Sequence, residues 1–423
     1  MLDVLRGSWA LLLGMLLLMV GNGLQGTLIG VRGDIEGFST LELSIIMSAN
    51  FAGFLGGSRA APIMIRRVGH IRVFAALGSL ISAALILFPL MIDPVSWTLL
   101  RVIIGFCFSA VYVTAESWLN NATTNENRGK TLSVYMVVQL TGVVSAQGLL
   151  VLGDPSGFTL FIVLSILVSV SFTPILLSVT PTPVFETTRP MGLKDLIQVS
   201  PLGCMGMLVL GGVYSAMFGM SAVYATSIGL SLGQISIFVA SFYVGGLLMQ
   251  YPIGWISDRV DRRWLIMLVS AAGAVAAVLA VISGGIFALI LAAAFVVGGM
   301  ANPLYSLLLA YTNDFLDHDQ MAAAGGGLIF INGVGAIFGP LVVGLLMDVT
   351  GPQGYFLFLV ALMAGLAAYA AYRMTVRPAP ATEDTGSYAP VLPSASPVAV
   401  EWAQEAFIEA SIEDEAGKND LAE

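Results

Sequence analysis

The stretch G-W-I-S-D-R-V-D-R-R, from Gly254 to Arg263, is the most informative part of this sequence. It places two carboxylates and three arginines within ten residues, in a chain of which only 10% is charged. Long apolar blocks run up to it and away from it, from Ile235 to Ile256 and from Leu265 to Ser283. A charged turn between two runs of about 20 apolar residues predicts two membrane-spanning helices joined by a short loop at the membrane surface.

Apolar blocks of this kind recur along the whole chain. Its 423 residues are 57% hydrophobic with a mean hydropathy of +0.91, which lies outside the range of soluble globular proteins. Twelve blocks are long enough to cross a bilayer as helices, which requires about 20 residues. They are Trp9–Ile29, Leu41–Ile63, Ile71–Ile92, Trp97–Leu119, Leu132–Leu152, Phe158–Val179, Leu202–Thr226, Ile235–Ile256, Leu265–Ser283, Ile286–Tyr311, Met321–Met347 and Tyr355–Tyr372. We expect an all-α integral membrane protein with twelve transmembrane helices.

The longest polar break divides these helices six and six. It gives an N-terminal half over residues 1–179, a connector over 180–200 and a C-terminal half over 201–373. A shift of 192 positions superimposes identical or similar residues of the two halves, which indicates a parallel repeat. The matched pairs are Phe51 with Tyr243, Gly53 with Gly245, Leu55 with Leu247, Arg67 with Arg259, and Val68 with Val260.

Residues 374–423 form a tail of different composition. They contain ten acidic and two basic residues, so they carry −8 of the formal net charge of −9. A tail with five prolines and this charge cannot bury enough apolar surface to fold alone, and we expect a disordered acidic tail. The part from Trp402 to Ile412 is the exception, since its sequence permits a short acidic helix.

The distribution of lysine and arginine sets the orientation. If the N-terminus is inside, Arg32 alone flanks the outer ends of the spans, and all other flanking cations are inside. The inner set is Arg6, Arg66, Arg67, Arg72, Arg128, Lys130, Arg189, Lys194, Arg259, Arg262, Arg263, Arg373 and Arg377. We expect a multi-pass protein of the cell inner membrane with both termini, the connector and the tail in the cytoplasm.

The loop at Gly254–Arg263 resembles the signature G-x-x-x-D-R-x-G-R-R of the major facilitator superfamily, with Asp261 in place of a glycine. The matching loop of the first half is degraded but keeps Arg67 and Gly69. The stretch from Arg101 to Ala110 is similar to the family's R-x-x-x-G motif. The stretches Glu116–Lys130 and Tyr251–Gly254 resemble the bacterial YcaD-like branch. The resemblance implies two six-helix halves that rock around a central substrate site.

The signature loop is expected to act as a conformational latch at the inner end of the helices. Its residues would hold the halves together in one state and release them in the other. The alternative is that these charges only set the topology. The candidate latch residues are Arg67, Gly69, Gly254, Asp258, Arg259, Arg262 and Arg263.

Arg101 is a candidate substrate-binding residue because it lies several residues inside the fourth span. Burying a cation there costs free energy, so such a residue is expected to have a function. At helical spacing it shares a face with Tyr112, which the resemblance places on the cavity side. The alternative is that Arg101 extends its side chain to the outer membrane interface. Glu116, near the inner end of the same span, either carries a coupling proton or pairs with a nearby arginine.

Uncharged polar residues on the spans that line the family's cavity complete the candidate site, although such residues also hold helices together. The set is Asn22, Gln25, Tyr214, Tyr224, Asn302 and Tyr305. It suits a planar or polar organic molecule, neutral or anionic. The sequence shows no metal-ligand set, no cofactor site and no catalytic group, and Arg128–Thr131 lacks the glycine and the strand of a nucleotide-binding loop.

Together these features predict a secondary active transporter, not an enzyme. It would act as a monomer on a small-molecule substrate in the lipid bilayer, without ATP or nucleic acid, with a proton as one candidate coupling ion. Nutrient or vitamin uptake, with flavins, aromatic acids and sugars as candidates, is preferred to drug efflux. The reason is that the stretch Thr141–Gly148 of the fifth span lacks the proline of the antiporter motif. Efflux and a non-transporting membrane sensor remain the alternatives.

Overall fold

The protein is described here by a computed structural model of residues 2–121, 123, 128–176, 191–376, 388, 390–392 and 394–404. These residues form helices and no strands. The first six spans are α1 (Leu2–Ile35), α2 (Thr40–Val68), α3 (His70–Leu87), α4 (Pro94–Asn121), α5 (Arg128–Leu150) and α6 with α7 (Thr159–Ser171 and Thr173–Leu176). The last six are α9 with η2 and α10 (Pro201–Ser215, Ala216–Met220 and Ser221–Ser227), α11 (Leu232–Ser257), α12 (Arg262–Ile282), α13 (Phe287–Asn313), α14 (His318–Thr350) and α15 (Gly354–Val376).

The expected membrane fold is confirmed. Eleven of the spans are long and apolar enough to cross a bilayer, counted over the described residues. The twelfth, α2, has 29 residues but carries Glu42, Arg59, Arg66 and Arg67, which make it more polar than the others. The short helix α8 (Leu193–Val199) lies in the connector, most of which falls outside the described residues.

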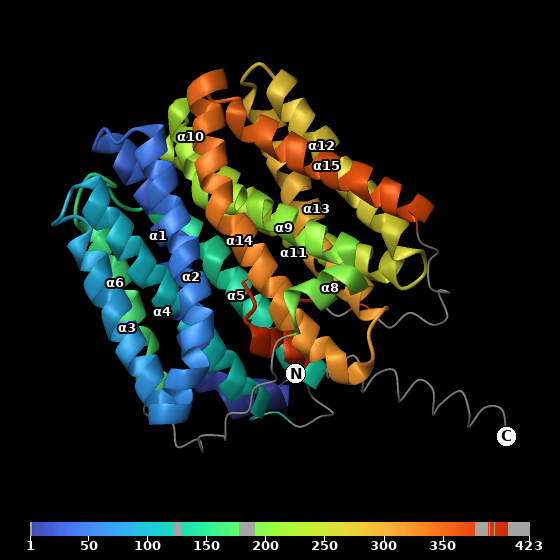
Figure 1. Cartoon of the computed structure of the whole chain (residues 1–423). Coiled ribbons are helices and arrows are strands. Elements are labelled where there is room, and N and C mark those ends of the chain that lie inside the picture. The colour runs from blue at the N-terminus through green and yellow to red at the C-terminus, as the bar shows by residue number, and fades with distance from the viewer. Residues whose placement is uncertain are drawn as a thin grey trace.

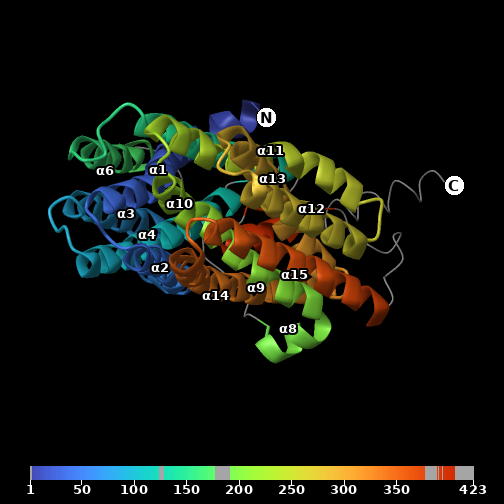
Figure 2. The same cartoon turned by 90° about the horizontal axis from the view of Figure 1, so that it is seen from above.

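The helices form two groups that lie side by side (Figures 1 and 2). In the first group α2 packs on α4, α1 on α5 and α3 on α6. The second group repeats this arrangement with α11 on α13, α9 on α14 and α12 on α15. The same pairs of spans therefore pack in each half, as the internal repeat requires.

Glycines explain the closest of these contacts. A Cβ atom on Gly53 or Gly105 would lie about 2 Å from a backbone oxygen of the facing helix, so α2 and α4 approach each other backbone to backbone. Gly245 and Gly298 occupy the equivalent positions between α11 and α13, with equally short distances. The repeat seen in the sequence is thus a repeat of helix packing.

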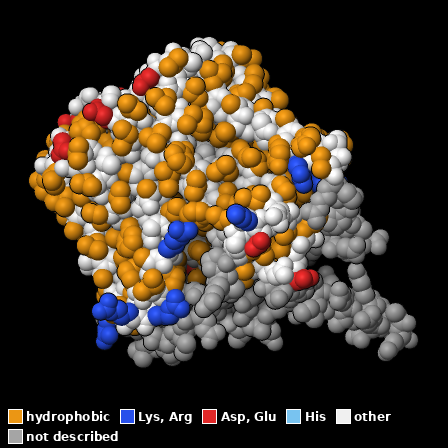
Figure 3. Space-filling view, viewed as in Figure 1, with side chains coloured by type: hydrophobic (Ala, Val, Ile, Leu, Met, Phe, Trp, Pro, Cys, Tyr) orange, Lys and Arg blue, Asp and Glu red, His pale blue; other side chains and the backbone are white. Residues whose placement is uncertain are grey.

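Basic side chains on the face in Figure 3 lie over its lower half and toward its right side, at the end of the bundle that we call the basic end. It carries the loop at Gly254–Arg263 and the turn at Gly69, while acidic side chains appear near the opposite end in that view. At the opposite end the halves touch directly, since Ser236 on α11 donates a hydrogen bond to the carbonyl oxygen of Gln147 on α5. The close approach of Gly344 on α14 to Ser44 on α2 belongs to the same end.

The described part of the tail differs from the expected disorder. Residues 388, 390–392 and 394–404, here called the C-terminal segment, lie against the bundle at the basic end, and residues 397–404 are helical. Val400 and Trp402 are fully buried. The helix predicted over Trp402–Ile412 thus begins earlier, at Pro397, and residues 405–412 lie outside the described part of the chain. The described stretch departs from the expectation because it buries its apolar side chains against the membrane helices rather than against itself.

Candidate functional site

A central cavity of about 190 Å³ lies between the two halves. One water needs roughly 10–15 Å³ measured this way, so the cavity has room for a small organic molecule. Its polar and aromatic lining includes Asn22, Gln25, Asn50, Phe51, Phe54, Arg101, Phe108, Tyr112, Gln139, Tyr214, Phe218, Tyr243, Asn302 and Asn332. These residues come from both halves, as a site that changes exposure when the halves rock requires.

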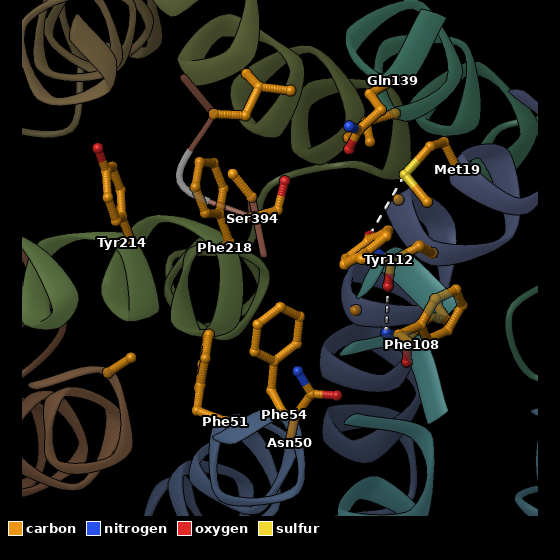
Figure 4. Close-up of a pocket in the computed structure, with 18 of the residues that line it drawn as sticks. Met19, Asn50, Phe51, Phe54, Phe108, Tyr112, Gln139, Tyr214, Phe218 and Ser394 are labelled. Carbon is orange, nitrogen blue, oxygen red and sulfur yellow. Dashed lines mark hydrogen bonds between the residues drawn. The ribbon is translucent and has the colours of Figure 1, made fainter. Parts of the chain in front are cut away.

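A hydrogen-bonded chain joins four of the predicted residues across α4 and α1. Arg101 donates to Oε1 of Gln25 at 2.5 Å, and Gln25 donates to Oδ1 of Asn22 at 3.2 Å. Asn22 in turn donates to the hydroxyl of Tyr112 at 2.8 Å. Figure 4 shows the contact of Tyr112 with the sulfur atom of Met19 as a dashed line. The four side chains form one wall of the cavity, and each one orients the next.

Arg101 is only 2% exposed, so its side chain does not extend to the membrane interface. Its other described partner is the sulfur atom of Met47, and it forms no ion pair with a carboxylate among the described residues. Nε of Arg101 and Oδ1 of Asn50 are buried without a hydrogen-bond partner in the described structure. A buried cation without a counter-charge is costly, and a bound anion or hydrogen-bond acceptor would relieve that cost.

Aromatic rings form the facing wall. Phe218 stacks on Tyr243 with ring centroids 4.7 Å apart and on Tyr214 with centroids 5.9 Å apart. Phe218 lies in η2, a π-helical turn that interrupts the seventh span, and such turns are frequent at functional sites. Figure 4 shows Phe218 and Phe54 among the residues that line the same space. This wall offers flat apolar surfaces to a planar ligand.

The remaining predicted site residues are not all in the cavity. Asn302 lines it, while Tyr305 is buried beside Tyr214, with ring centroids 6.3 Å apart. Tyr224 lies elsewhere and stacks on Tyr355 at 4.8 Å, because α10 turns its ring into an aromatic cluster of the C-terminal half. Tyr224 therefore does not line this cavity.

Glu116 is fully buried just outside the cavity lining. Its carboxylate accepts hydrogen bonds from the hydroxyl of Tyr135 and from the backbone N–H of Ser396, both at 3.0 Å. No arginine pairs with it among the described residues, so the pairing considered from the sequence is not observed. Ser396 instead supplies the polar partner from the C-terminal segment.

The signature loop makes its described contacts within its own half and with the C-terminal segment. Arg262 pairs with Asp314 on the C-terminal side of α13, and both side chains are buried. Arg263 pairs with Asp261 at 2.7 Å. Desolvation acts to raise the pKa of Asp261, but the hydrogen bonds and charge of Arg263 outweigh it and lower that pKa.

The other predicted latch residues belong to this loop and to the matching turn of the first half. Arg259 is exposed, with its guanidinium over the ring of Trp255. Burial raises the pKa of Asp258, against the opposing effect of a hydrogen bond from the backbone of Tyr388. In the first half, Arg67 is exposed and Gly69 ends α2 with φ at 85°, a conformation that favours glycine.

Several lining residues were missed from the sequence. They are Asn50, Phe54, Gln139, Phe218 and Asn332. Phe51 and Tyr243 carried a signal, since the shift of 192 positions matches them to each other and both line the cavity. The sequence repeat could therefore have located one aromatic from each half.

Known proteins agree with this fold. The family model of the Major Facilitator Superfamily matches residues 202–408. The uncharacterized MFS-type transporter YcaD of Escherichia coli O6:K15:H31 (strain 536 / UPEC) is 28% identical over 352 residues, which cover 81% of this chain and 89% of the relative. YcaD of Escherichia coli O157:H7 (strain EC4115 / EHEC) has the same identity and coverage.

Solved structures show the same architecture. The crystal structure of the nucleoside transporter NupG matches with a TM-score of 0.76 at 13% identity, over 86% of this chain and 99% of that one. A bacterial homolog of the human lysosomal transporter Spinster, in an inward-facing and unoccupied conformation, matches with a TM-score of 0.67 at 14% identity, over 95% and 98%. This chain therefore has the fold of the solved transporters, and its sequence is similar to the Major Facilitator Superfamily over residues 202–408 and to the YcaD-type relatives over 81% of its length.

Proposed function

We propose that this chain is a secondary transporter of the major facilitator type, that it carries a small organic anion with a planar ring, and that Arg101 binds the anionic or hydrogen-bond-accepting group of this substrate. Aromatic acids and flavins are examples of this chemistry. The observation that carries the proposal is that Arg101 is the one charged side chain among the described residues that line the central cavity. The cavity therefore has a positive charge that only its contents can neutralise.

The aromatic wall supports the planar part of the substrate. Tyr214, Phe218 and Tyr243 present stacked rings to the same cavity, and a planar ligand can pack against such faces. The amides of Gln25, Asn22 and Asn302 add donors and acceptors that can fix its orientation. An elongated aliphatic cation would lose its hydration here without gaining a negative partner.

We propose uptake in preference to efflux, on the absence of the antiporter proline in the fifth span. Residues 1–179 and 201–373 would rock as two halves around the cavity, with Arg101 contributed by the first and the aromatic stack by the second. The signature loop would act on the position of the halves through Asp258, which binds the C-terminal segment, since the contacts around Arg262 lie within one half.

A comparative uptake screen tests this function. Cells with the protein, without it, and with the Arg101→Ala variant should be incubated with a defined metabolite mixture, and depletion measured for each compound. We expect depletion of one or a few planar anionic compounds by the wild type alone. Depletion restricted to cationic amines, or equal depletion by the Arg101→Ala variant, would contradict the assignment.

We propose that the protein lies in the cell inner membrane with the basic end in the cytoplasm. Single cysteines at Ser156 and Val260 test this, because both residues are exposed and lie in loops at opposite ends of the bundle. An impermeant maleimide added outside spheroplasts should label the cysteine at 156, and should label the cysteine at 260 only after permeabilisation. The reverse pattern would overturn the orientation.

A further inference from the structure

The C-terminal segment contacts the signature loop of the C-terminal half. The backbone N–H of Tyr388 donates to Asp258 at 2.7 Å. Its ring covers Gly254, where a Cβ atom would lie 2.6 Å from a ring carbon. Its hydroxyl accepts a hydrogen bond from Gln250 at 2.9 Å and donates one to the carbonyl oxygen of Pro303 at 3.3 Å. The glycine of the signature loop thus leaves room for a residue of the tail.

The same segment then crosses to the N-terminal half and returns. Val391 exchanges two hydrogen bonds with the hydroxyl of Ser306 on α13. Five residues later, Ser396 donates its backbone N–H to Glu116 on α4, a buried carboxylate of the other half. Gln404 donates back to Oδ1 of Asn313 at 3.3 Å. One short stretch of chain therefore ties both halves together at the basic end.

The segment also forms part of the wall of two cavities. Leu392, Ser394 and Ala395 line the central cavity, and Figure 4 shows Ser394 among the aromatic residues there. Pro397 and Val398 line a second cavity of about 450 Å³ at the basic end. The cavities share Leu55, Ser58 and Ile329 as lining residues, so the segment lies between the substrate site and the basic end.

The local sequence favours a helix that packs at this place. Ser396 caps the helix over residues 397–404, since its hydroxyl accepts from the backbone N–H of Val398, and Pro397 occupies the first helical position. Val400 packs against Gly325 on α14, and Trp402 is fully buried. Ordering this stretch costs conformational entropy that offsets much of the gain from burial, which suits a contact that forms and dissociates.

We propose that the C-terminal segment is a built-in inhibitor that closes the basic end of the central cavity and holds the two halves in one position. Its place between the halves is visible at the lower centre of Figure 1. The inhibitory effect rests on the proposed transport function, because the segment must dissociate before substrate passes at this end and before the halves can rock. Release by a cellular signal would then switch the transporter on.

Accessibility of a cavity cysteine tests the closure without any substrate. Ser58→Cys is a nearly isosteric change at a residue that lines both cavities, and the native Cys107 and Cys204 are buried. In inside-out vesicles, a chain that stops after Arg377 should be labelled by an impermeant maleimide at least 5-fold faster than the full chain. A chain that stops after Gln404 is the matched control, because it loses tail residues but keeps the segment, and should be labelled as slowly as the full chain.

A reversible cross-link tests the effect on transport in the full chain. Cysteines at Ser306 and Val391 replace residues that hydrogen-bond directly, so they should form a disulfide under mild oxidation. We expect oxidation to stop solute flux by the double variant and reductant to restore it, while each single variant is unaffected. A synthetic peptide of residues 388–404, added at the basic end, should slow the chain truncated after Arg377, and a scrambled peptide should not.

These results separate the inhibitor from the transport function. Faster labelling after truncation, with no flux of any solute, would support the closure and contradict the proposed transport. Unchanged labelling after truncation at Arg377, or undiminished flux through a fully cross-linked protein, would overturn the inhibitor whatever the substrate is.

Discussion

Replacing Arg101 with lysine should lower the initial rate of transport by at least about 10-fold, although the charge is kept. Arg101 donates to Gln25 from a planar guanidinium and has a further buried N–H, at Nε, without a described partner. Lysine cannot reproduce this geometry. A hydrogen bond to a charged group contributes about 1.5–3 kcal/mol, which corresponds to roughly 10- to 100-fold in binding.

The matched control is Arg72→Lys. Arg72 is exposed on α3, so the same chemical change there should leave the rate within about 2-fold, since exposed charged groups contribute little. Initial rates should be compared in proteoliposomes at equal protein abundance. Normal transport by Arg101→Lys would show that the arginine does not make directional contacts with the substrate.

Removing the guanidinium of Arg262 should destabilise the protein more than any other change in the signature loop. Arg262 and the Asp314 carboxylate are 2% and 4% exposed, and Arg262 also donates to Ser257 and to the carbonyl oxygen of Ala310. Breaking a buried pair by removing one partner costs about 3–5 kcal/mol. Arg262→Met should therefore lower the melting temperature in detergent by several degrees.

Two comparisons distinguish the ion pair from a general effect of the loop. Arg259→Met removes an exposed arginine of the same loop and should leave the melting temperature almost unchanged. Asp314→Asn combined with Arg262→Met removes both charges and should recover a substantial part of the loss. If the double variant melts as low as Arg262→Met or lower, the carboxylate is not what makes the single change costly.

The fold was predictable because the bilayer imposes a simple rule on the sequence. Runs of about 20 apolar residues separated by charged turns have few alternatives to membrane helices. The repeat was predictable too, because the close approach of Gly53 to α4 recurs at Gly245 in the other half. Only α2 departs from the simple pattern, since its inner end carries several arginines.

The candidate site was only partly predictable. Arg101 stood out because a cation inside a span is rare, and the structure places it in the cavity. Tyr224 was selected because its span lines the family's cavity, but its ring lies in the aromatic cluster with Tyr355, so the span alone does not identify which of its residues reach the cavity. Asn50 and Gln139 were missed because single amides inside spans resemble residues that only hold helices together.

The C-terminal segment shows that amino-acid composition alone does not predict local structure in the tail. Acidic residues and prolines across the tail favour disorder, so the composition of the whole tail does not show that a helix begins at Ser396 and Pro397. Serine before proline, followed by apolar residues, is a recognised signal for the beginning of a helix. Its docking site comprises residues from both halves, including Glu116 and Ser306, and no local pattern could reveal it.

Solute counterflow in proteoliposomes tests the central claim most directly, namely that this chain is a secondary transporter whose cavity binds substrate at Arg101. Vesicles loaded with an excess of the unlabelled compound identified by the screen are diluted into a trace of labelled compound, without ATP. We predict transient accumulation of label by the wild type, and none by Arg101→Ala or by empty vesicles. Absence of accumulation by both the wild type and the chain that stops after Arg377, or equal accumulation by Arg101→Ala, would contradict the account.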